Sequence, residues 1–390
     1  MAKALKNVVV AAYGRSAVAR SGKKGALRAL HPIDMAGLTL AGVLSKLPQL
    51  PPALVEDVIL GCALPEGPQG LNPARLVAAR AGLPHTACGL TVDRFCSSSL
   101  QAVALAAWQI EAGQADVIVA GGMESMTALP ISADRRGDWD PWLVEHDPAQ
   151  YISNGETAER VAERYGVTRE EMDALALESH RRAAAAQDAG IFAKEIVPLP
   201  GVDEEGRPMV FDRDQGVRRD TSLEKLAGMK PCFREDGRVT AATSSQTSDG
   251  AAFLVLMSRE KAGALGIQPV ASFLGYAVGG LDPAYMGLGP IHAVPRVMGL
   301  TGLTTGQMDV VELNEAFAAQ VIPCVRELGL DPAKVNPNGG AMALGHPLGA
   351  TGAVLSCKAL TELRRAGGRY AMVTMCIAGG MGAAGVFMAE

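Results

Sequence analysis

The sequence predicts an α/β protein in which largely buried strands alternate with helices. Three observations support this class: short apolar runs alternate with longer helical patterns, one order of loop, helix and strand occurs twice, and the apolar content can fill large cores. Of the 390 residues, 48% are hydrophobic and 20% are charged. At roughly 150 residues per domain, this length predicts two or three domains.

The predicted strands are short apolar runs of the length expected for buried strands. They cover residues 8–12, 58–60, 117–120, 253–257, 310–313 and 371–375. The stretch from about residue 127 to residue 242 is different, because it is richer in charge, Trp, Tyr, Asp and Pro. We interpret it as an insertion or cap domain.

The repeated pattern suggests two similar halves. Residues 96–123 run from a Cys-Ser-Ser-Ser stretch through a helical pattern and a strand to Gly-Gly-Met, and residues 346–381 run from His346 through a helix and a strand to another Gly-Gly-Met. Two such halves packed together would place both loops at helix N-termini, where backbone N–H groups favour negative charge. The alternative is that any two strand–helix units look alike.

Charge and cysteine content narrow the classes of function. The net charge is −5 without a long run of Lys or Arg, which argues against nucleic acid as a partner. Seven cysteines are scattered without CxxC spacing, and the first residues read as a strand, not as a secretory signal. No apolar stretch reaches the roughly 20 residues of a membrane span. We therefore expect a cytoplasmic protein, and the Cys and His spacings predict no metal site.

Cys96 is the first candidate for catalysis. It lies between a β-type run that ends at Phe95 and an Ala-rich helical pattern, among small hydroxyl residues. A helix terminus should favour the thiolate, and the small neighbours leave room for a substrate. A buried structural cysteine is the alternative, but Cys-Ser-Ser-Ser at a helix start favours a nucleophile.

His346 is the candidate base. It lies in the glycine-dense stretch 339–349, which permits tight turns and close approach of the backbone to a ligand. Such a histidine could take the thiol proton and later donate to a developing oxyanion. A capping or packing histidine is the alternative, and the glycine context favours catalysis.

Two further side chains stand at strand ends. Cys376 ends an apolar run before a glycine-rich turn, and a second thiol suits proton transfer at carbon. Taken alone, it would be judged a core cysteine. Asn314 follows the 310–313 run, where its amide could orient a water or bind a carbonyl. A helix N-cap is an equally good interpretation of Asn314 on local grounds.

With these residues assembled, the chain resembles the thiolase family over essentially its full length. The matching segments, in the family's order, are residues 93–102, 121–126, 314–317, 336–352 and 376–382. Five motifs in the right order are a highly specific signal. The resemblance implies a five-layered αβαβα fold of two similar halves with an inserted loop domain, and an active site where the halves meet.

The implied domain boundaries follow from this division. We expect residues 1–122 together with 243–270 to form the N-terminal half, residues 123–242 to form the loop domain, and residues 271–390 to form the C-terminal half.

The resemblance also implies a role for each candidate. Cys96 looks like the nucleophile that takes an acyl group from coenzyme A, His346 like its activator, and Cys376 like the acid/base that acts on the α-carbon of the acetyl unit. Asn314 resembles the residue that holds a water which, with His346, forms one oxyanion hole. The backbone N–H groups of Cys96 and Ala378 would form the other.

Contacts to coenzyme A are implied in the same way. Ser245 resembles the serine that contacts pantetheine, Arg218 resembles a residue near the adenine, and Phe317 is expected to contact coenzyme A as well. Two positions depart from the family: Asp93 stands where many members carry Asn, and Ala378 stands where many carry Gly. Coenzyme A is expected as substrate and product, with no permanently bound cofactor.

The choice between degradative and biosynthetic thiolases turns on the loop domain. Biosynthetic acetoacetyl-CoA thiolases usually carry His-Met-Gly where this sequence has Ser153-Asn154-Gly155, whereas residues 142–151 and 286–290 look more like degradative 3-ketoacyl-CoA thiolases. We therefore expect thiolysis of 3-ketoacyl-CoA to acetyl-CoA and a shortened acyl-CoA, by a ping-pong mechanism through acyl-Cys96. An acetyl-CoA acetyltransferase of the biosynthetic type is the alternative.

Two other classes make different predictions. A decarboxylating ketoacyl synthase shares the fold but typically uses two histidines with its cysteine, whereas the last loop here carries Cys376. A non-catalytic acyl-CoA or lipid carrier would have lost the catalytic set, which is present. The expected partners are acyl-CoA, coenzyme A, further copies in a homodimer or homotetramer, and other β-oxidation enzymes in a complex.

Overall fold

The structure, a computed structural model, describes residues 4–131 and 136–390. Its main strands follow one hydrogen-bonded path in the order β11-β12-β13-β10-β1-β9-β5-β3-β4. The strands of this path are β1 (Val8–Ser16), β3 (Asp57–Gly61), β4 (Cys88–Val92), β5 (Val117–Ser125), β9 (Ser248–Ser258), β10 (Ala271–Gly280), β11 (Val310–Leu313), β12 (Tyr370–Ile377) and β13 (Met381–Ala389). The short strands β2 (Ala19–Arg20) and β6 (Ile196–Val197) attach to it, and β7 (Leu199–Val202) pairs separately with β8 (Pro208–Phe211).

The path consists of two sheets joined along a short seam. At this seam β1 pairs with β10 in only two places, where Val9 lies opposite Ser272 and Val10 opposite Ala271. On one side the order is β4-β3-β5-β9-β1, and on the other it is β11-β12-β13-β10. The edge strand β4 pairs in parallel with β3 and has no counterpart in the path of the second sheet. In the four remaining strands of the first sheet and in the second sheet, the first pair is parallel and the next two are antiparallel. The prediction of two similar halves is therefore confirmed at the level of topology.

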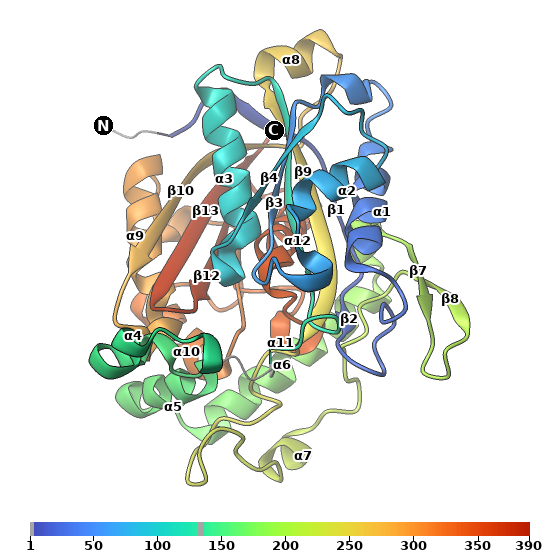
Figure 1. Ribbon diagram of the computed structural model, residues 1–390. Helices are drawn as coiled ribbons and strands as arrows, with labels where there is room; N and C mark the ends of the chain where they lie inside the picture. Colours follow the sequence, from blue (N-terminus) through green and yellow to red (C-terminus); the bar gives the residue numbers. More distant parts are fainter. Residues whose placement is uncertain (1–3, 132–135) are drawn as a thin grey trace.

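Helices form three layers around these sheets (Figure 1). The outer face of the first sheet is covered by α1 (Pro32–Leu44) and α2 (Pro73–Arg80), and the outer face of the second by α9 (Gly289–Thr301) and α10 (Ala318–Glu327). Between the sheets lie α3 (Ser98–Glu111) and α12 (Thr351–Ala366), which pack on each other and on strands of both halves. The result is the expected five-layered αβαβα arrangement.

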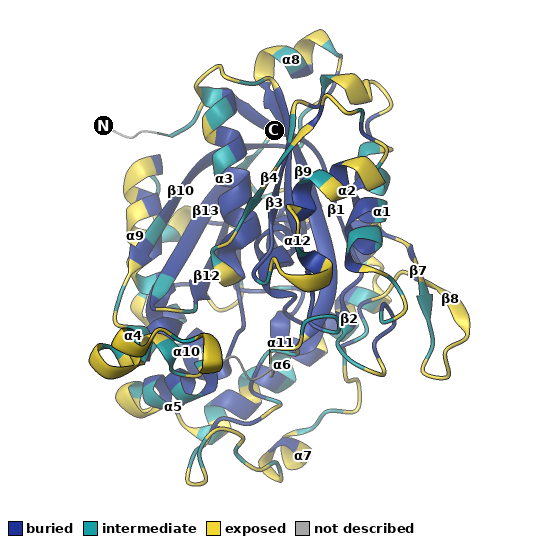
Figure 2. Ribbon diagram, in the orientation of Figure 1, coloured by how far each residue is buried: buried dark blue, intermediate teal, exposed yellow. Residues whose placement is uncertain are grey.

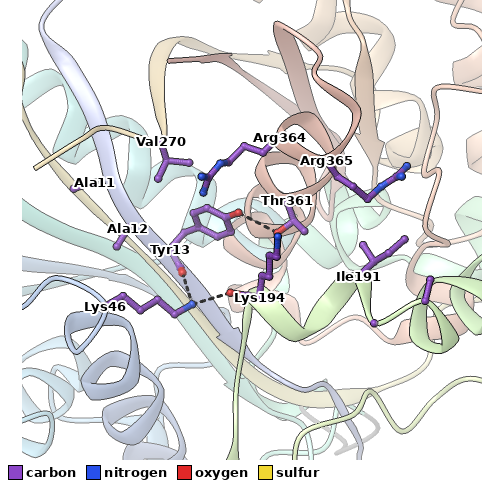
Figure 3. Close-up of a pocket in the computed structure, with 12 residues that line it drawn as sticks. Ala11, Ala12, Tyr13, Lys46, Ile191, Lys194, Val270, Thr361, Arg364 and Arg365 are labelled. Carbon is purple, nitrogen blue, oxygen red and sulfur yellow. Dashed lines mark hydrogen bonds between the residues drawn. The ribbon is translucent and has the colours of Figure 1, made fainter.

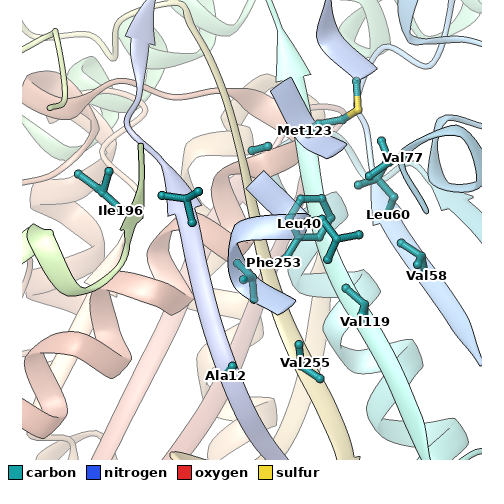
Figure 4. Close-up of a cluster of buried hydrophobic side chains, with 14 of the residues drawn as sticks. Ala12, Leu40, Val58, Leu60, Val77, Val119, Met123, Ile196, Phe253 and Val255 are labelled. Atoms are coloured by element: carbon teal, nitrogen blue, oxygen red, sulfur yellow. The ribbon is translucent and has the colours of Figure 1, made fainter. Parts of the chain in front are cut away.

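Burial follows from the alternation of side chains along the strands. On β3, Val58 and Leu60 contact the outer core with Leu40 of α1 (Figure 4), whereas Ile59 faces the middle layer with Leu100 of α3. Because helices cover both faces of the two sheets, their central strands are almost entirely dark blue in Figure 2, whereas the edge strand β4 and the β7–β8 hairpin are teal and yellow. This explains why the strands appear in the sequence as continuous apolar runs.

Helices and a hairpin lie between β5 and β9 in the sequence. The helices are α4 (Pro141–His146), α5 (Asn154–Tyr165), α6 (Arg169–Asp188) and α7 (Leu223–Ala227), and the hairpin is β7–β8. Two more helices, α8 (Arg259–Ala264) and the short α11 (Ala341–Leu344), lie in the C-terminal part of the sequence. No helix in the described part of the chain is long and apolar enough to cross a membrane.

The sequence predictions differ from the structure in two respects. Each predicted strand is present, and the β-type run expected before Cys96 corresponds to β4, but β10 and β13 were not predicted as strands. The two Gly-Gly-Met stretches are also not equivalent. Gly121 and Gly122 lie inside β5, which continues to Ser125 past the boundary expected at residue 122, whereas Gly379 and Gly380 form the turn from β12 to β13.

Candidate active site

Cys96 lies just before α3, the helix that the first half contributes to the middle layer. It belongs to the 3₁₀ turn η3 (Phe95–Ser97), which leads directly into α3. The expected β-type run ends earlier, at Val92, and Phe95 adopts a left-handed conformation with φ of 44°. The Asp93 carboxylate accepts the Phe95 N–H at 2.7 Å and so stabilises this strained turn. The residue that departs from the family pattern thus positions the backbone beside Cys96.

His346 reaches Cys96 from the second half. Its Nε2 lies 3.3 Å from the Cys96 Sγ, across 250 residues of sequence. The backbone N–H of His346 donates to the Gln246 carbonyl at 3.0 Å and to the Ser248 hydroxyl at 3.1 Å. Because both the ring and the backbone are held, the imidazole is placed to take the thiol proton.

Asn314 is also at this centre and does not cap a helix. It follows β11 directly, while α10 begins at Ala318 with Phe317 in the N-cap position. The Asn314 Nδ2 lies 3.4 Å from the His346 Nε2, and its buried Oδ1 has no hydrogen-bond partner among the described residues. The N-cap interpretation is therefore wrong, and the amide faces the imidazole of His346.

Cys376 and Ala378 close the site from β12. Cys376 is fully buried at the end of this strand, and its pKa is raised by desolvation first and then by the nearby Cys96 and Cys324. The backbone N–H groups of Ala378 and of Cys96 itself both act on the Cys96 sulfur and lower its pKa. His346, Cys376 and the Ala378 N–H group thus lie around the Cys96 sulfur, Asn314 contacts His346, and the two N–H groups can receive negative charge there.

The electrostatics of the site are set by burial. Desolvation raises the pKa of Cys96 to about 12, against the lowering effect of the two N–H groups, and it lowers the pKa of His346 to about 4. The expectation that the helix terminus would favour the thiolate is therefore wrong for the free enzyme. Cys96 rests as a thiol beside a neutral imidazole, a pair that is ready for proton transfer when a substrate arrives.

Thr351, the first residue of α12, completes the imidazole environment and was not predicted. Its Oγ1 lies 2.6 Å from the His346 Nδ1. When the hydroxyl accepts the Nδ1 proton, Nε2 carries the lone pair that accepts from Cys96 and from the Asn314 amide. The only sequence signal was a hydroxyl residue five positions after the histidine, at the start of a helix.

Thr351→Val is expected to lower the turnover number for thiolysis by about 10- to 100-fold. Valine leaves the buried Nδ1–H without an acceptor, so the other tautomer, which has no base at Nε2, becomes populated. Steady-state kinetics and thermal unfolding would separate this effect from a loss of stability. Thr351→Ser keeps the hydroxyl and should retain most activity, and equal rates for Thr351→Val and the wild type would contradict this role.

Of the three residues expected to contact coenzyme A, only Arg218 lines a cavity. Arg218 lines a cavity of about 140 Å³ with His180, Lys225, Gln246 and Met342, next to the loop that carries His346. Ser245 does not line this cavity but is adjacent in sequence to Gln246, and its N–H donates to the Ala316 carbonyl. Phe317 does not line it either, and its ring packs edge-on against Phe233 at 5.9 Å.

A second cavity, of about 540 Å³, contains none of the predicted site residues. It opens between β1, the turn Ile191–Lys194 and the end of α12, and Tyr13, Lys46, Lys194, Arg364 and Arg365 contribute to its lining (Figure 3). The volume of this cavity is therefore a poor guide to the active site, because the candidate catalytic residues lie around Cys96.

Two family models of known proteins match the chain. Residues 8–260 match the family model for the thiolase N-terminal domain, and residues 267–389 match the model for the thiolase C-terminal domain.

Individual relatives match over almost the whole chain. A 3-ketoacyl-CoA thiolase from Bacillus subtilis (strain 168) is 46% identical, with 98% of this chain and 99% of the relative covered. A 3-oxoadipyl-CoA/3-oxo-5,6-dehydrosuberyl-CoA thiolase from Escherichia coli (strain K12) is 42% identical, with 95% and 96% covered. The crystal structure of the Bacillus anthracis acetyl-CoA acetyltransferase is 41% identical, with a TM-score of 0.91 and all of both chains covered. The chain belongs to the thiolase family.

Proposed function

We propose that this thiolase cleaves 3-ketoacyl-CoA with coenzyme A, giving acetyl-CoA and an acyl-CoA shortened by two carbons. The observation that carries the proposal is the arrangement around Cys96: an imidazole base 3.3 Å from its sulfur, two backbone N–H groups acting on the sulfur, and a second buried thiol nearby. One thiol can hold the acyl group while the other moves protons, which is what reversible cleavage of a carbon–carbon bond requires.

In the first half-reaction, His346 takes the Cys96 proton and the sulfur attacks the 3-keto carbon of the substrate. The Cys96 and Ala378 N–H groups receive the oxyanion that forms on that carbon. The bond between C2 and C3 then breaks, and its electron pair passes to the acetyl-CoA enolate. The Cys376 thiol protonates C2, while the His346 Nε2–H and a water held by the Asn314 amide stabilise the enolate oxygen. Acetyl-CoA leaves, and the shortened acyl group stays on Cys96 as a thioester.

In the second half-reaction, free coenzyme A displaces the acyl group. The Cys376 thiolate takes the proton of the incoming thiol, and the resulting coenzyme A thiolate attacks the acyl-Cys96 carbonyl within the same N–H pair. The bond to Cys96 breaks, and the His346 proton returns to the Cys96 sulfur. The enzyme is thus regenerated with coenzyme A consumed as a substrate, and we propose no permanently bound cofactor.

The loop region supports a degradative preference. Ser153 occupies the N-cap of α5, where its hydroxyl accepts from the Glu156 N–H at 3.2 Å, and Gly155 packs directly against the Phe233 ring. The histidine and methionine typical of biosynthetic acetoacetyl-CoA thiolases are thus replaced by residues used for local structure. The name of the solved Bacillus anthracis relative favours the biosynthetic alternative.

A series of 3-ketoacyl-CoA substrates tests this proposal. We expect thiolysis to proceed with higher kcat/KM for chains longer than acetoacetyl-CoA, and mass spectrometry of quenched enzyme to find the shortened acyl group on the Cys96 peptide. Activity confined to acetoacetyl-CoA would support the biosynthetic alternative. Binding of coenzyme A without any acyl adduct would support a non-catalytic carrier instead.

We also propose a cytoplasmic homodimer or homotetramer, open to association with other β-oxidation enzymes. The support for self-association is the edge strand β4, which ends the sheet path and exposes Leu90. Leu71 and Phe95 are also exposed, and the Asn72 side chain next to Leu71 donates to Gly89 of β4. A second copy aligned along β4 would cover this apolar edge. We further propose that residues 123–242 act as the loop domain that receives coenzyme A, with Arg218 beside its adenine.

A further inference from the structure

Glu124 is a fully buried carboxylate that the proposed mechanism does not use. It lies near the end of β5 in the Gly-Gly-Met-Glu-Ser-Met stretch, and it makes no ion pair among the described residues. Its Oε2 accepts the backbone N–H of Ala63 at 2.8 Å and that of Gly349 at 2.9 Å. Its Oε1 accepts the Gln69 amide at 2.7 Å.

These bonds join the two halves beside the nucleophile. Ala63 follows β3 of the first half, whereas Gly349 lies in the turn η9 (Leu348–Ala350) of the second half, between His346 and Thr351. Ala63 and Leu348 also pack in one small buried cluster with Cys96 and Met126. One carboxylate oxygen therefore connects the wall of the Cys96 pocket to the loop that carries the imidazole.

Close packing leaves the turn few alternative positions. A Cβ on Gly122 would lie 2.3 Å from the Gly349 carbonyl oxygen, and a Cβ on Gly349 would lie 2.7 Å from the Cys62 Cα. The η9 turn therefore lies directly against the backbone of β5 and of the segment after β3. The hydrogen bonds that Ala63 and Gly349 donate to Glu124 fix the position of the η9 turn relative to β3. Because His346 lies just before this turn, they also fix its distance from Cys96.

Burial raises the pKa of Glu124, whereas the N–H groups directed at its carboxylate favour the ionised form. Ala63, Gly349 and Gln69 all direct N–H groups at it, and Gln69 cannot reverse its amide because its Oε1 accepts the Ser125 N–H at 2.6 Å. A protonated oxygen would point a hydrogen at another donor. The buried charge also acts on the nucleophile, since it raises the pKa of Cys96.

We propose that Glu124 is a positioning residue of this active site, whose buried carboxylate joins Ala63 to Gly349 and so holds His346 at hydrogen-bonding distance from Cys96. The proposal rests on the roles of Cys96 and His346 given under the proposed function. The charge of Glu124 also adds to the desolvation that raises the pKa of Cys96.

Two substitutions of Glu124 separate the effect of its side-chain length from the effect of its negative charge. Glu124→Gln keeps the length but turns an amide NH₂ toward one set of donors, so we expect the turnover number to fall by about 10- to 100-fold. Without the charge, the pH midpoint of Cys96 alkylation by iodoacetamide should move about one unit lower. Glu124→Asp keeps the charge but shortens the reach, so the turnover number should fall while the midpoint stays in place.

Glu159→Gln is the matched control. Glu159 is also buried and accepts the backbone N–H groups of Arg238 and Val239, but it lies on α5 away from the η9 turn. We expect it to change thermal stability without moving the alkylation midpoint. Wild-type turnover in both Glu124 variants would overturn the proposal, as would the same midpoint shift in Glu159→Gln. The alkylation measurement needs no acyl substrate, so an enzyme without thiolysis activity would refute the proposed function and leave this test intact.

Discussion

Cys96→Ala is expected to abolish thiolysis, with a loss of turnover of at least about 10⁴-fold. The substitution removes the atom that we propose to carry the acyl group, while the N–H groups of residues 96 and 378 and the imidazole of His346 stay in place. Because Cys96 is 5% exposed and alanine is smaller, the fold should tolerate the change. The measurement is thiolysis of a 3-ketoacyl-CoA followed by loss of its enolate absorbance.

Cys376→Ser provides the informative comparison for this experiment. A hydroxyl is too weak an acid and base for proton transfer at C2, so turnover should also fall steeply. Cys96 is still present in this variant, however, and should still form an acetyl adduct from acetyl-CoA that mass spectrometry can detect. Measurable thiolysis by Cys96→Ala, or an adduct on another residue, would contradict the assignment of the nucleophile.

Arg15→Leu is expected to destabilise the protein by about 3–5 kcal/mol. Arg15 is fully buried on β1, and its guanidinium donates to Glu195 at 2.7 Å and to both oxygens of Asp214 at 2.7 and 2.9 Å. Leucine would leave two buried carboxylates without their counter-charge, a far larger penalty than the loss of an exposed ion pair. Urea unfolding followed by circular dichroism measures the difference.

An exposed arginine of the same region serves as the control. Arg207 pairs with Asp203 at the surface, so Arg207→Leu should leave the urea midpoint almost unchanged. The Arg15 ion pairs connect β1 to both ends of the segment that contains the β7–β8 hairpin. Equal midpoints for Arg15→Leu and the wild type would show that this buried network contributes no net stability.

The sequence predicted strands that are rich in branched apolar residues and did not predict β13, which carries small ones near its start. Strand β13 carries Gly and Ala from Gly382 to Gly385. Gly382 lies against Gly289, where an added Cβ would come within 2.1 Å of backbone, and Gly385 lies against Leu100. Such residues have low intrinsic strand propensity, so only the tertiary contact reveals them.

The sequence predicted those site residues whose chemical role can be recognised from the residue type and its motif. Cys96, His346, Asn314 and Cys376 lie in recognisable motifs and meet in the structure. Thr351 was not predicted because a hydroxyl at a helix start has many roles, and only the turn of the backbone directs it to Nδ1. The direction of the Cys96 pKa shift was predicted wrongly because it depends on burial by both halves.

The sharing of the middle layer between the two halves has a consequence for biosynthesis. Residues of α3 such as Leu100 and Val103 pack in one core with Ala353 and Leu360 of α12, which the ribosome delivers only near the end of translation. Until α12 has been synthesised, the first sheet of the nascent chain lacks the helix that covers part of its apolar inner face. Such a partly folded state is prone to aggregation. Chaperone dependence should therefore be concentrated late in synthesis, and a fragment that ends before residue 351 should be insoluble when expressed alone.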